Sequence, residues 1–275
     1  MNPFDHIILI HLNQVIRNSP IVTKMIVAIY GNGLMTGIFV ALLWGVWFDQ
    51  SNTERQRQTR EKIIAGVVGS LVCLVIVRMM TAFLPFRHRP LTDPSNGLIF
   101  PVTSGGWEHW SSFPSDNAAL FFLLTICLFS TSRVMGWIGL LDTVCLICFP
   151  RVFVGVHYPT DVIGGAVLGM LAGYIVIRKS IRSYLARYPL QWMEVHPPSF
   201  YASAFLVTFL FASVFWPVLS LLISLKKLLY FESRLPLVYS LSGLAIFVAV
   251  LALVGLWGRM YWEKAQNHHP DHSLQ

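Results

Sequence analysis

Charged side chains are scarce in this sequence. Only 12% of the 275 residues are charged, whereas 55% are hydrophobic. A soluble domain carries roughly 25% charged residues, so this chain lacks the polar surface that would cover a water-facing globule. Lipid must therefore cover much of it, and the length fits one compact helical bundle. The net charge of +7 comes from Lys and Arg between apolar runs. That pattern indicates membrane orientation and argues against nucleic acid as a partner.

Cysteine is also rare and offers little chemistry. The cysteines are Cys73, Cys127, Cys145 and Cys148, and all four lie inside apolar runs. A thiol in such a run is usually a packing residue. No histidine pair completes a zinc pattern with the Cys145 and Cys148 pair. We therefore expect no metal site and no other cofactor.

The N-terminus lacks the features of a cleavable signal peptide. Its first 16 residues contain no Lys or Arg, and Asp5 interrupts their apolar stretch. Residues 4–16 are instead typical of a short helix lying at the membrane interface. We assign residues 1–20 to this interfacial segment.

Long apolar runs dominate the rest of the chain. About seven of them reach the length of about 20 residues that a spanning helix needs. Strands would leave backbone groups unpaired in lipid, so the predicted fold class is an all-α, multi-pass transmembrane bundle. The predicted spans are 24–47, 63–84, 113–131, 134–153, 160–177, 200–224 and 237–257. The expected organisation is a core at 21–180, two additional spans within 181–265 and a disordered tail at 266–275.

Lys and Arg are shared unequally between the two sides of these spans. One set of connecting segments carries eleven, and the other carries five when the motif arginines described below are set aside. The richer side is predicted to be cytoplasmic. The ends of the second and fourth spans and the starts of the third and fifth then lie on the outer face.

Three polar segments fall at that outer face. They are residues 84–90 (LPFRHRP), 111–117 (SSFPSDN) and 151–161 (RVFVGVHYPTD). Arginine suits planar, bidentate binding of phosphate oxygens, so Arg87, Arg89 and Arg151 are candidate phosphate ligands. Ser115 can cap the helix that it opens, and the free N–H groups behind it favour an anion. The set predicts a site for a phosphate group.

His157 and Asp161 supply the reactive parts of this site. A histidine can attack phosphorus as a nucleophile. Asp161 follows four residues later, after Pro159 at a first helical position, so one helical turn brings its carboxylate near the His157 ring. There it can fix the tautomer and stabilise the imidazolium. The chemistry predicted is phosphoryl transfer.

The three segments resemble the motifs of the type 2 phosphatidic acid phosphatases, which share a core with vanadium haloperoxidases and glucose-6-phosphatase. That family carries K-x6-R-P, P-S-G-H and S-R-x5-H-x3-D. Arg89-Pro90 matches the first motif, Pro114-Ser115 the second, and Arg151, His157 and Asp161 the third, within residues 60–180. The forms LPFRHRP and FPSD are similar to a bacterial, membrane-bound branch that acts on undecaprenyl diphosphate.

The resemblance implies a metal-independent lipid phosphatase that works through a phosphohistidine. His157 would be the nucleophile, Asp161 its partner, and Arg89, Ser115 and Arg151 the phosphate ligands. The substrate would be a lipid phosphate or diphosphate, reached at the outer face of a bacterial cytoplasmic membrane. The oligomeric state is left open.

The sequence departs from the family at two chemically important positions. Ala82 stands where the first motif has lysine; Arg87 is the preferred replacement, and Arg78 the weaker one because Pro85 follows it. Asn117 replaces the second-motif histidine, which protonates the leaving oxygen, and a neutral amide cannot do so. Asp116 is one alternative proton donor; the others are Glu108, His109 and His88.

Asn117 leads to a prediction about substrate. A phosphate leaving group, with a pKa of about 6, needs an acid far less than an alkoxide, which is about as basic as hydroxide. We therefore expect a lipid diphosphate to be preferred over phosphatidic acid. Two alternatives stay open: a phosphotransferase that uses the same phosphohistidine, and a lipid-phosphate binding or transport protein with weakened catalysis.

Overall fold

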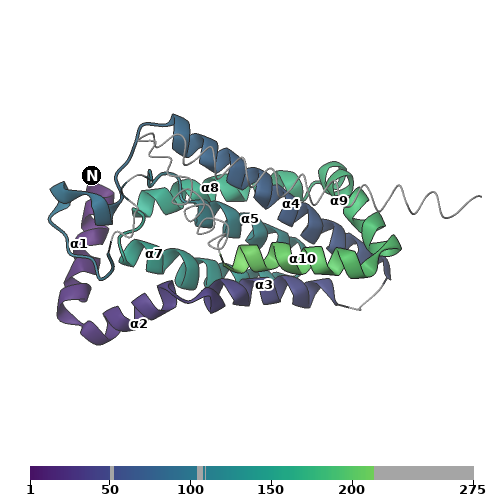
Figure 1. The fold of residues 1–275 in the computed structure, drawn as a ribbon, viewed down its shortest axis with the longest axis horizontal. Coiled ribbons are helices and arrows are strands. Elements are labelled where there is room, and N and C mark those ends of the chain that lie inside the picture. The colour runs from purple at the N-terminus through teal and green to yellow at the C-terminus, as the bar shows by residue number, and fades with distance from the viewer. Residues whose placement is uncertain (50–52, 104–107, 109, 214–275) are drawn as a thin grey trace, which may run out of the picture.

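The computed structural model describes residues 1–49, 53–103, 108 and 110–213, and the regular elements in these ranges are all helical (Figure 1). In chain order they are α1 (Pro3–Asn18), α2 (Pro20–Tyr30), α3 (Gly33–Trp47), α4 (Thr53–Phe83), the short 3-10 turns η1 (Pro90–Thr92) and η2 (Pro94–Asn96), α5 (Asp116–Thr131), α6 (Arg133–Leu141), the π-helical η4 (Asp142–Cys148), α7 (Phe149–Phe153), α8 (Pro159–Val176), α9 (Lys179–Val195) and α10 (Pro197–Ala212). The all-helical prediction is confirmed for these residues.

The prediction of about seven spans is not confirmed by the described part of the chain. In the described part, three helical stretches are long and apolar enough to cross a bilayer: α4, the stretch 133–153 made of α6, η4 and α7, and α8. A fourth exists if α2 and α3, bent by 51°, count as one span. The apolar helices α5 and α10 have 16 residues each. That is shorter than the roughly 20 residues that a bilayer requires.

Two further expectations differ in detail. The first predicted span, 24–47, is broken between α2 and α3, because Asn32 caps a new helix by accepting a hydrogen bond from the Leu34 amide at 2.9 Å. The basic stretch after the fifth span was expected to be a connecting segment and instead forms the helix α9. The second half of the span 200–224, the span 237–257 and the tail 266–275 lie outside the described residues.

The core of the bundle is the packing of α5 against α8 and α4. Glycines on α8 make the first contact very close. A Cβ atom added at Gly165 or Gly169 would collide with the backbone oxygen of Ser115 or Ala119. Such small residues let helix backbones approach in a membrane. The start of α5 is therefore fixed against the start of α8, where two of the motif segments lie.

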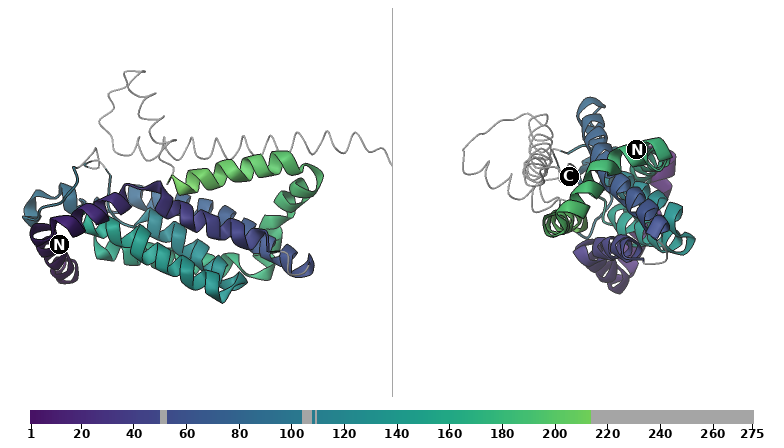
Figure 2. Two further views of the ribbon diagram at one scale, coloured as in Figure 1. Left: turned by 90° about the horizontal axis from the view of Figure 1, so that it is seen from below. Right: turned by 90° about the vertical axis from the view of Figure 1, so that its right-hand side faces the viewer.

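The polar segments gather at one end of the bundle. The connection from α4 to α5 lies beside α1 and the end of α7 there, whereas α9 lies at the opposite end (Figure 1). A view from below shows α1 at the same end (Figure 2). The predicted N-terminal helix is present as α1; its place at a membrane interface stays a prediction.

Candidate active site

Backbone hydrogen bonds join the three motif segments. The Ser112 amide donates to the Arg87 carbonyl at 2.9 Å, which ties the first segment to the second. The Ser115 amide donates to the Asp161 carbonyl at 3.0 Å, which ties the second to the third. The convergence expected from the order of the spans is therefore present. The ends of α4 and α7 and the starts of α5 and α8 build one polar site.

His157 lies at the centre of this site and is only 3% exposed. Its Nδ1 is 2.9 Å from the Ser112 carbonyl oxygen, which can only accept, so Nδ1 carries the proton. Nε2 then holds the lone pair, and it faces the Arg89 guanidinium with Nη1 at 3.5 Å. Burial lowers the pKa of His157 below its ordinary 6.5, against the opposing charge of Asp161. The ring is therefore neutral near pH 7, and its Nε2 lone pair faces Arg89 Nη1 as a hydrogen-bond acceptor.

Asp161 is fully buried and lies close to the ring without bonding to it in this arrangement. Its Oδ2 is 3.8 Å from His157 Nδ1 and accepts a hydrogen bond from the Tyr158 amide at 2.7 Å. Its Oδ1 accepts from Arg87 at 2.5 Å. The nearest partner of the imidazole N–H is thus the Ser112 carbonyl, and the Asp161 carboxylate holds the start of α8 in place.

Arg89 is buried and held by main-chain oxygens. Its guanidinium donates to the carbonyls of Val156 at 2.8 Å, Trp110 at 3.3 Å and Ser111 at 3.4 Å. Burial lowers its pKa to about 10, so the group stays charged near neutral pH. The positive charge is therefore fixed in position beside His157 Nε2, as a phosphate ligand requires.

Arg87 was expected to bind phosphate, and the structure surrounds it with acidic partners. Nη1 donates to Asp161 at 2.5 Å and to the Thr160 hydroxyl at 2.9 Å, and Nη2 donates to Asp5 at 2.7 Å. Its guanidinium also stacks on the Tyr158 ring at 4.2 Å. In this structure Arg87 joins α1, the segment after α4 and the start of α8.

Asp5 is a residue of this cluster that the sequence reasoning missed. It is fully buried, and besides Arg87 it accepts hydrogen bonds from the Thr160 amide at 3.0 Å and hydroxyl at 2.6 Å. The available signal was an acidic residue interrupting an apolar stretch, because a buried carboxylate needs a partner. That signal was used only to argue against a signal peptide.

Arg78 and Asp116 form a second ion pair, with Nη2 and Oδ2 2.5 Å apart. The Arg78 guanidinium also lies over the Trp110 ring at 5.5 Å. The other carboxylate oxygen of Asp116 accepts from the amide and side chain of Asn117, at 2.8 and 2.9 Å. An ion-paired carboxylate that accepts several hydrogen bonds is favoured in its charged form. Asp116 is thus arranged as an acceptor.

Arg78 was the weaker candidate to replace the missing lysine at Ala82, and the reason given for this was wrong. Helix α4 continues to Phe83, so Pro85 lies beyond its end and does not interrupt it at Arg78. Positions 78 and 82 are one turn apart on the same face. The longer Arg78 side chain therefore reaches the start of α5 from one turn further back.

The remaining predicted residues lie at the edges of the site. Ser115 is 1% exposed and caps α5, its hydroxyl accepting from the Ala118 amide at 3.4 Å. Arg151 donates to the Ile147 carbonyl at 2.6 Å and makes no ion pair with a described carboxylate. The buried Asn117 Oδ1 has no hydrogen-bond partner among the described residues. His109 lies outside them.

The described ranges contain no group of three or more His, Cys, Asp or Glu side chains that could hold a metal ion. What the site does contain is a neutral imidazole, a fixed guanidinium beside it, and three further arginines around them, Arg78, Arg87 and Arg151. These groups bind oxyanions and can form a bond to phosphorus.

Comparisons with known proteins agree with this chemistry. The PAP2 superfamily matches residues 62–184. Undecaprenyl-diphosphatase BcrC of Bacillus subtilis is 25% identical over 142 residues, which cover 52% of this chain and 67% of that protein. The bacitracin transport permease protein BcrC of Bacillus licheniformis is 31% identical over 140 residues, covering 50% of this chain and 63% of that protein.

A third relative comes from an archaeon. The undecaprenyl-diphosphatase of Sulfolobus acidocaldarius is 37% identical over 123 residues, which cover 44% of this chain and 57% of that protein. No solved structure matches the chain significantly. The matched residues contain all three motif segments and helices α5 to α8, and the predicted resemblance is confirmed. Residues 62–184 of this chain match the PAP2 superfamily and form its PAP2 domain.

Proposed function

We propose that this protein hydrolyses a polyprenyl diphosphate or a related lipid phosphate through a phosphohistidine on His157. One observation carries the proposal. His157 Nδ1 is 2.9 Å from a carbonyl oxygen while Nε2 lies 3.5 Å from the charged Arg89. The Nε2 lone pair thus faces the guanidinium that would hold the oxygens of a bound phosphoryl group.

In the first step the Nε2 lone pair attacks the terminal phosphorus of the substrate. The N–P bond forms, the bond from phosphorus to the bridging oxygen breaks, and that oxygen leaves with the electron pair on the lipid phosphate. Arg89, Arg151 and the Ser115 end of α5 would hold the non-bridging oxygens as charge redistributes. Asp161 would stabilise the imidazolium electrostatically, because its carboxylate is 3.8 Å from Nδ1.

Arg78 would complete the phosphate site in place of the first-motif lysine. Its guanidinium lies at the start of α5, where it now pairs with Asp116 at 2.5 Å. A bound phosphate would compete with that carboxylate for the same donors. Arg87, with its two carboxylate partners, would position Asp161 and has less capacity left for a ligand.

The substrate preference follows from Asn117 and Asp116. Neither side chain is arranged to act as a general acid, because Asn117 is a neutral amide and Asp116 is an ion-paired carboxylate. A lipid monophosphate leaving group has a pKa of about 6 and needs no such donor. A diphosphate is therefore the preferred substrate class, as the names of the Bacillus subtilis and Sulfolobus acidocaldarius relatives also suggest.

In the second step an acceptor attacks the phosphorus of the phosphohistidine and the N–P bond breaks. With water as the acceptor, inorganic phosphate is released and a proton passes to solvent. With a lipid or sugar hydroxyl, the same intermediate would make the protein a phosphotransferase. The site would face the outside of the membrane, because the loops at the other end carry more Lys and Arg.

The test is metal-free phosphate release from undecaprenyl diphosphate by the full chain in detergent, beside His157→Ala. Release that the variant loses is the expected result, together with a denaturation-stable, acid-labile phosphoryl label on the wild type. Faster turnover of phosphatidic acid than of the diphosphate would contradict the substrate preference. Binding of both lipids without any turnover would instead support a binding or transport protein.

A further inference from the structure

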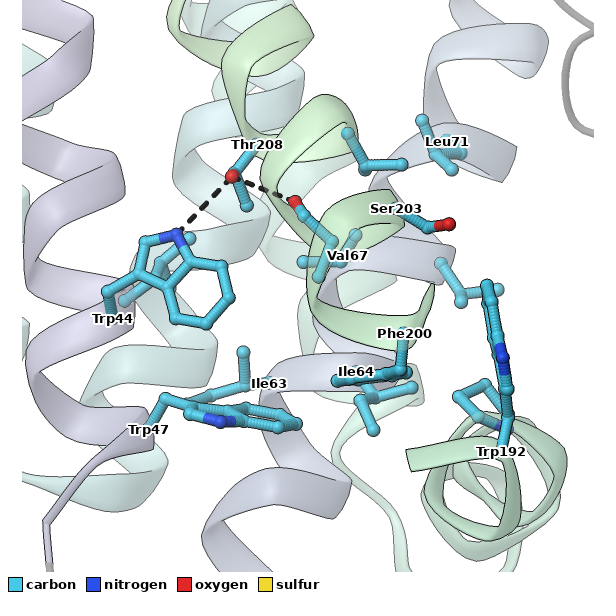
Figure 3. A pocket seen from close by; sticks show the side chains of 15 residues that line it. Trp44, Trp47, Ile63, Ile64, Val67, Leu71, Trp192, Phe200, Ser203 and Thr208 are labelled. Carbon is cyan, nitrogen blue, oxygen red and sulfur yellow. Dashed lines mark hydrogen bonds between the residues drawn. The ribbon is translucent and has the colours of Figure 1, made fainter. Parts of the chain in front are cut away.

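A second, apolar site lies away from the motif residues. A cavity of about 200 Å³ opens between α3, α4, α9 and α10 (Figure 3). Its wall includes three tryptophans, Trp44, Trp47 and Trp192, with Phe200 at the centre. An engineered cavity of about 150 Å³ with similar walls binds benzene, so this one has room for a segment of hydrocarbon chain.

The cavity is distinct from the catalytic site. On α4 it runs from Ile63 to Leu71. Arg78, which reaches the catalytic site, lies about 10 Å beyond Leu71 along the helix axis. The wall formed by α9 beyond residue 184 and by α10 also lies outside the matched family domain.

Arg60 lies at the edge of this cavity. The Arg60 guanidinium lies 5.2 Å from the centroid of the Trp47 ring. Its Nε atom is buried and has no hydrogen-bond partner among the described residues. Arg182 Nε also lacks a hydrogen-bond partner among the described residues, but it forms an ion pair with Glu61 at 3.6 Å. Arg57 also pairs with Glu61, at 3.9 Å, whereas Arg60 has no ion pair with a described carboxylate. A buried hydrogen-bond donor without a partner destabilises the folded protein, so an anion that accepts from Arg60 would be bound favourably.

The Trp47 ring that contacts Arg60 belongs to an aromatic cluster. Its neighbour Trp44 has its ring centroid 6.1 Å from that of Trp47 and 6.3 Å from that of Tyr201. Such aromatic groups are typical of the headgroup level of a bilayer. A ligand that satisfies both parts of the site has an anionic head for Arg60 and a hydrocarbon chain for the cavity.

We infer that this cavity binds one acyl chain of an anionic phospholipid, with the lipid phosphate at Arg60. Charge complementarity favours a lipid over the apolar run 237–257 of this chain, because that run contains no Asp or Glu to pair with Arg60. The site is a lipid contact of its own and does not depend on the reaction at His157.

The cavity supplies its own fluorescent reporters, because three tryptophans line it. Full-length protein in detergent is titrated with phosphatidylglycerol whose acyl chains carry bromine, which quenches nearby tryptophan. Phosphatidylcholine with the same chains tests the headgroup. Arg60→Gln removes the cation, with Arg57→Gln on the same helix as its control. Ala204→Phe fills the cavity from α10, with the exposed Leu206→Phe as its control.

We expect saturable quenching by brominated phosphatidylglycerol and binding that is about tenfold weaker for phosphatidylcholine. Arg60→Gln should weaken the binding of phosphatidylglycerol by about the same factor. Ala204→Phe should abolish the saturable phase, and both controls should keep it. Val67→Phe fills the same cavity from α4 and replaces Ala204→Phe if that variant does not fold.

Two results would overturn the inference. If phosphatidylglycerol and phosphatidylcholine bound with equal affinity, and Arg60→Gln left both affinities unchanged, the site would not recognise an anionic headgroup. If brominated phosphatidylglycerol quenched the wild type and Ala204→Phe equally, with no saturable phase in either, lipid would not enter the cavity. The chain itself or a partner protein would then close it.

Discussion

The arginines at the two ends of this bundle differ in their partners. At the motif end, Arg87 is bracketed by Asp5 and Asp161, and Arg78 pairs with Asp116 at 2.5 Å. At the opposite end Arg60 has an aromatic ring for a neighbour and no described carboxylate partner. The first end is a set of mutually oriented charges, and the second is a cation beside an apolar cavity.

The difference shows what each end is built to recognise. Charges that satisfy one another hold their geometry without a ligand, as a site that stabilises a transition state must. A cation without a partner is stabilised when an anion binds, as in a site for a lipid headgroup. The predictions that follow test the first half of this contrast by removing its members one at a time.

The largest effect is expected at His157. His157→Ala removes the proposed nucleophile and should lower phosphate release from undecaprenyl diphosphate by about 10⁴-fold or more. His11→Ala is the control, because the His11 ring is exposed on α1, with Nδ1 2.7 Å from the Ile7 carbonyl oxygen. Equal losses in the two variants would remove His157 from its proposed role.

Asp5 should matter most for stability. Asp5→Asn breaks a buried ion pair and leaves the Arg87 guanidinium short of one acceptor, which should lower the free energy of unfolding by about 3–5 kcal/mol. Thermal unfolding in detergent measures this, with the exposed Asp49→Asn as control. A shift no larger than that of the control would mean that α1 does not brace the site.

Arg78→Ala should reduce kcat/KM by about 10²-fold, because a charged donor to the phosphate is lost. Arg78→Lys should recover part of the loss, since lysine keeps the charge and loses the bidentate fork. The exposed Arg57→Ala on the same helix should have almost no effect. If Arg78→Ala retained full activity, the pair with Asp116 would be structural only.

The smallest effect is a change of rate with pH. His157 acts only when neutral, and burial lowers its pKa below 6.5, so activity should stay high at pH 7 and fall only in more acidic solution. Arg89 must be charged, and its pKa is about 10, so activity should also fall as the pH approaches that value. The pH profile of kcat/KM measures both limbs. An acid limb above pH 7 would contradict a neutral, buried His157.

The sequence was sufficient to place the motif residues together, because the order of the spans fixes which helix ends share a membrane face. It predicted the positions of His157, Arg89 and Ser115 at one site, and the backbone bonds between the segments confirm that convergence. Local spacing could not show the partners of Arg87, because Asp5 is 82 residues away along the chain. Long-range pairs of this kind leave no periodic pattern.

Side-chain reach was the other limit. Pro85 was the reason for preferring Arg87 over Arg78 as the replacement for the missing lysine. Because α4 ends at Phe83, that proline does not interrupt the helix at Arg78. The i, i+4 spacing predicted the Asp161 carboxylate near the His157 ring, and it lies 3.8 Å from Nδ1. The spacing could not show that the Ser112 carbonyl oxygen, 45 residues away along the chain, lies closer to the same nitrogen at 2.9 Å.

The link between Asp5 and Thr160 sets an order of events during synthesis. The two residues are 155 positions apart, and both Thr160 contacts to Asp5 require the start of α8. At typical synthesis rates of about 5–20 residues per second, α1 waits roughly 8–30 s on the ribosome for its partner. During that interval Asp5 lacks both of its hydrogen bonds from Thr160, and Arg87 lacks its ion pair with Asp161. The proposed catalytic end is therefore completed late, after α8 has emerged, so a nascent chain that stops short of it cannot turn over lipid.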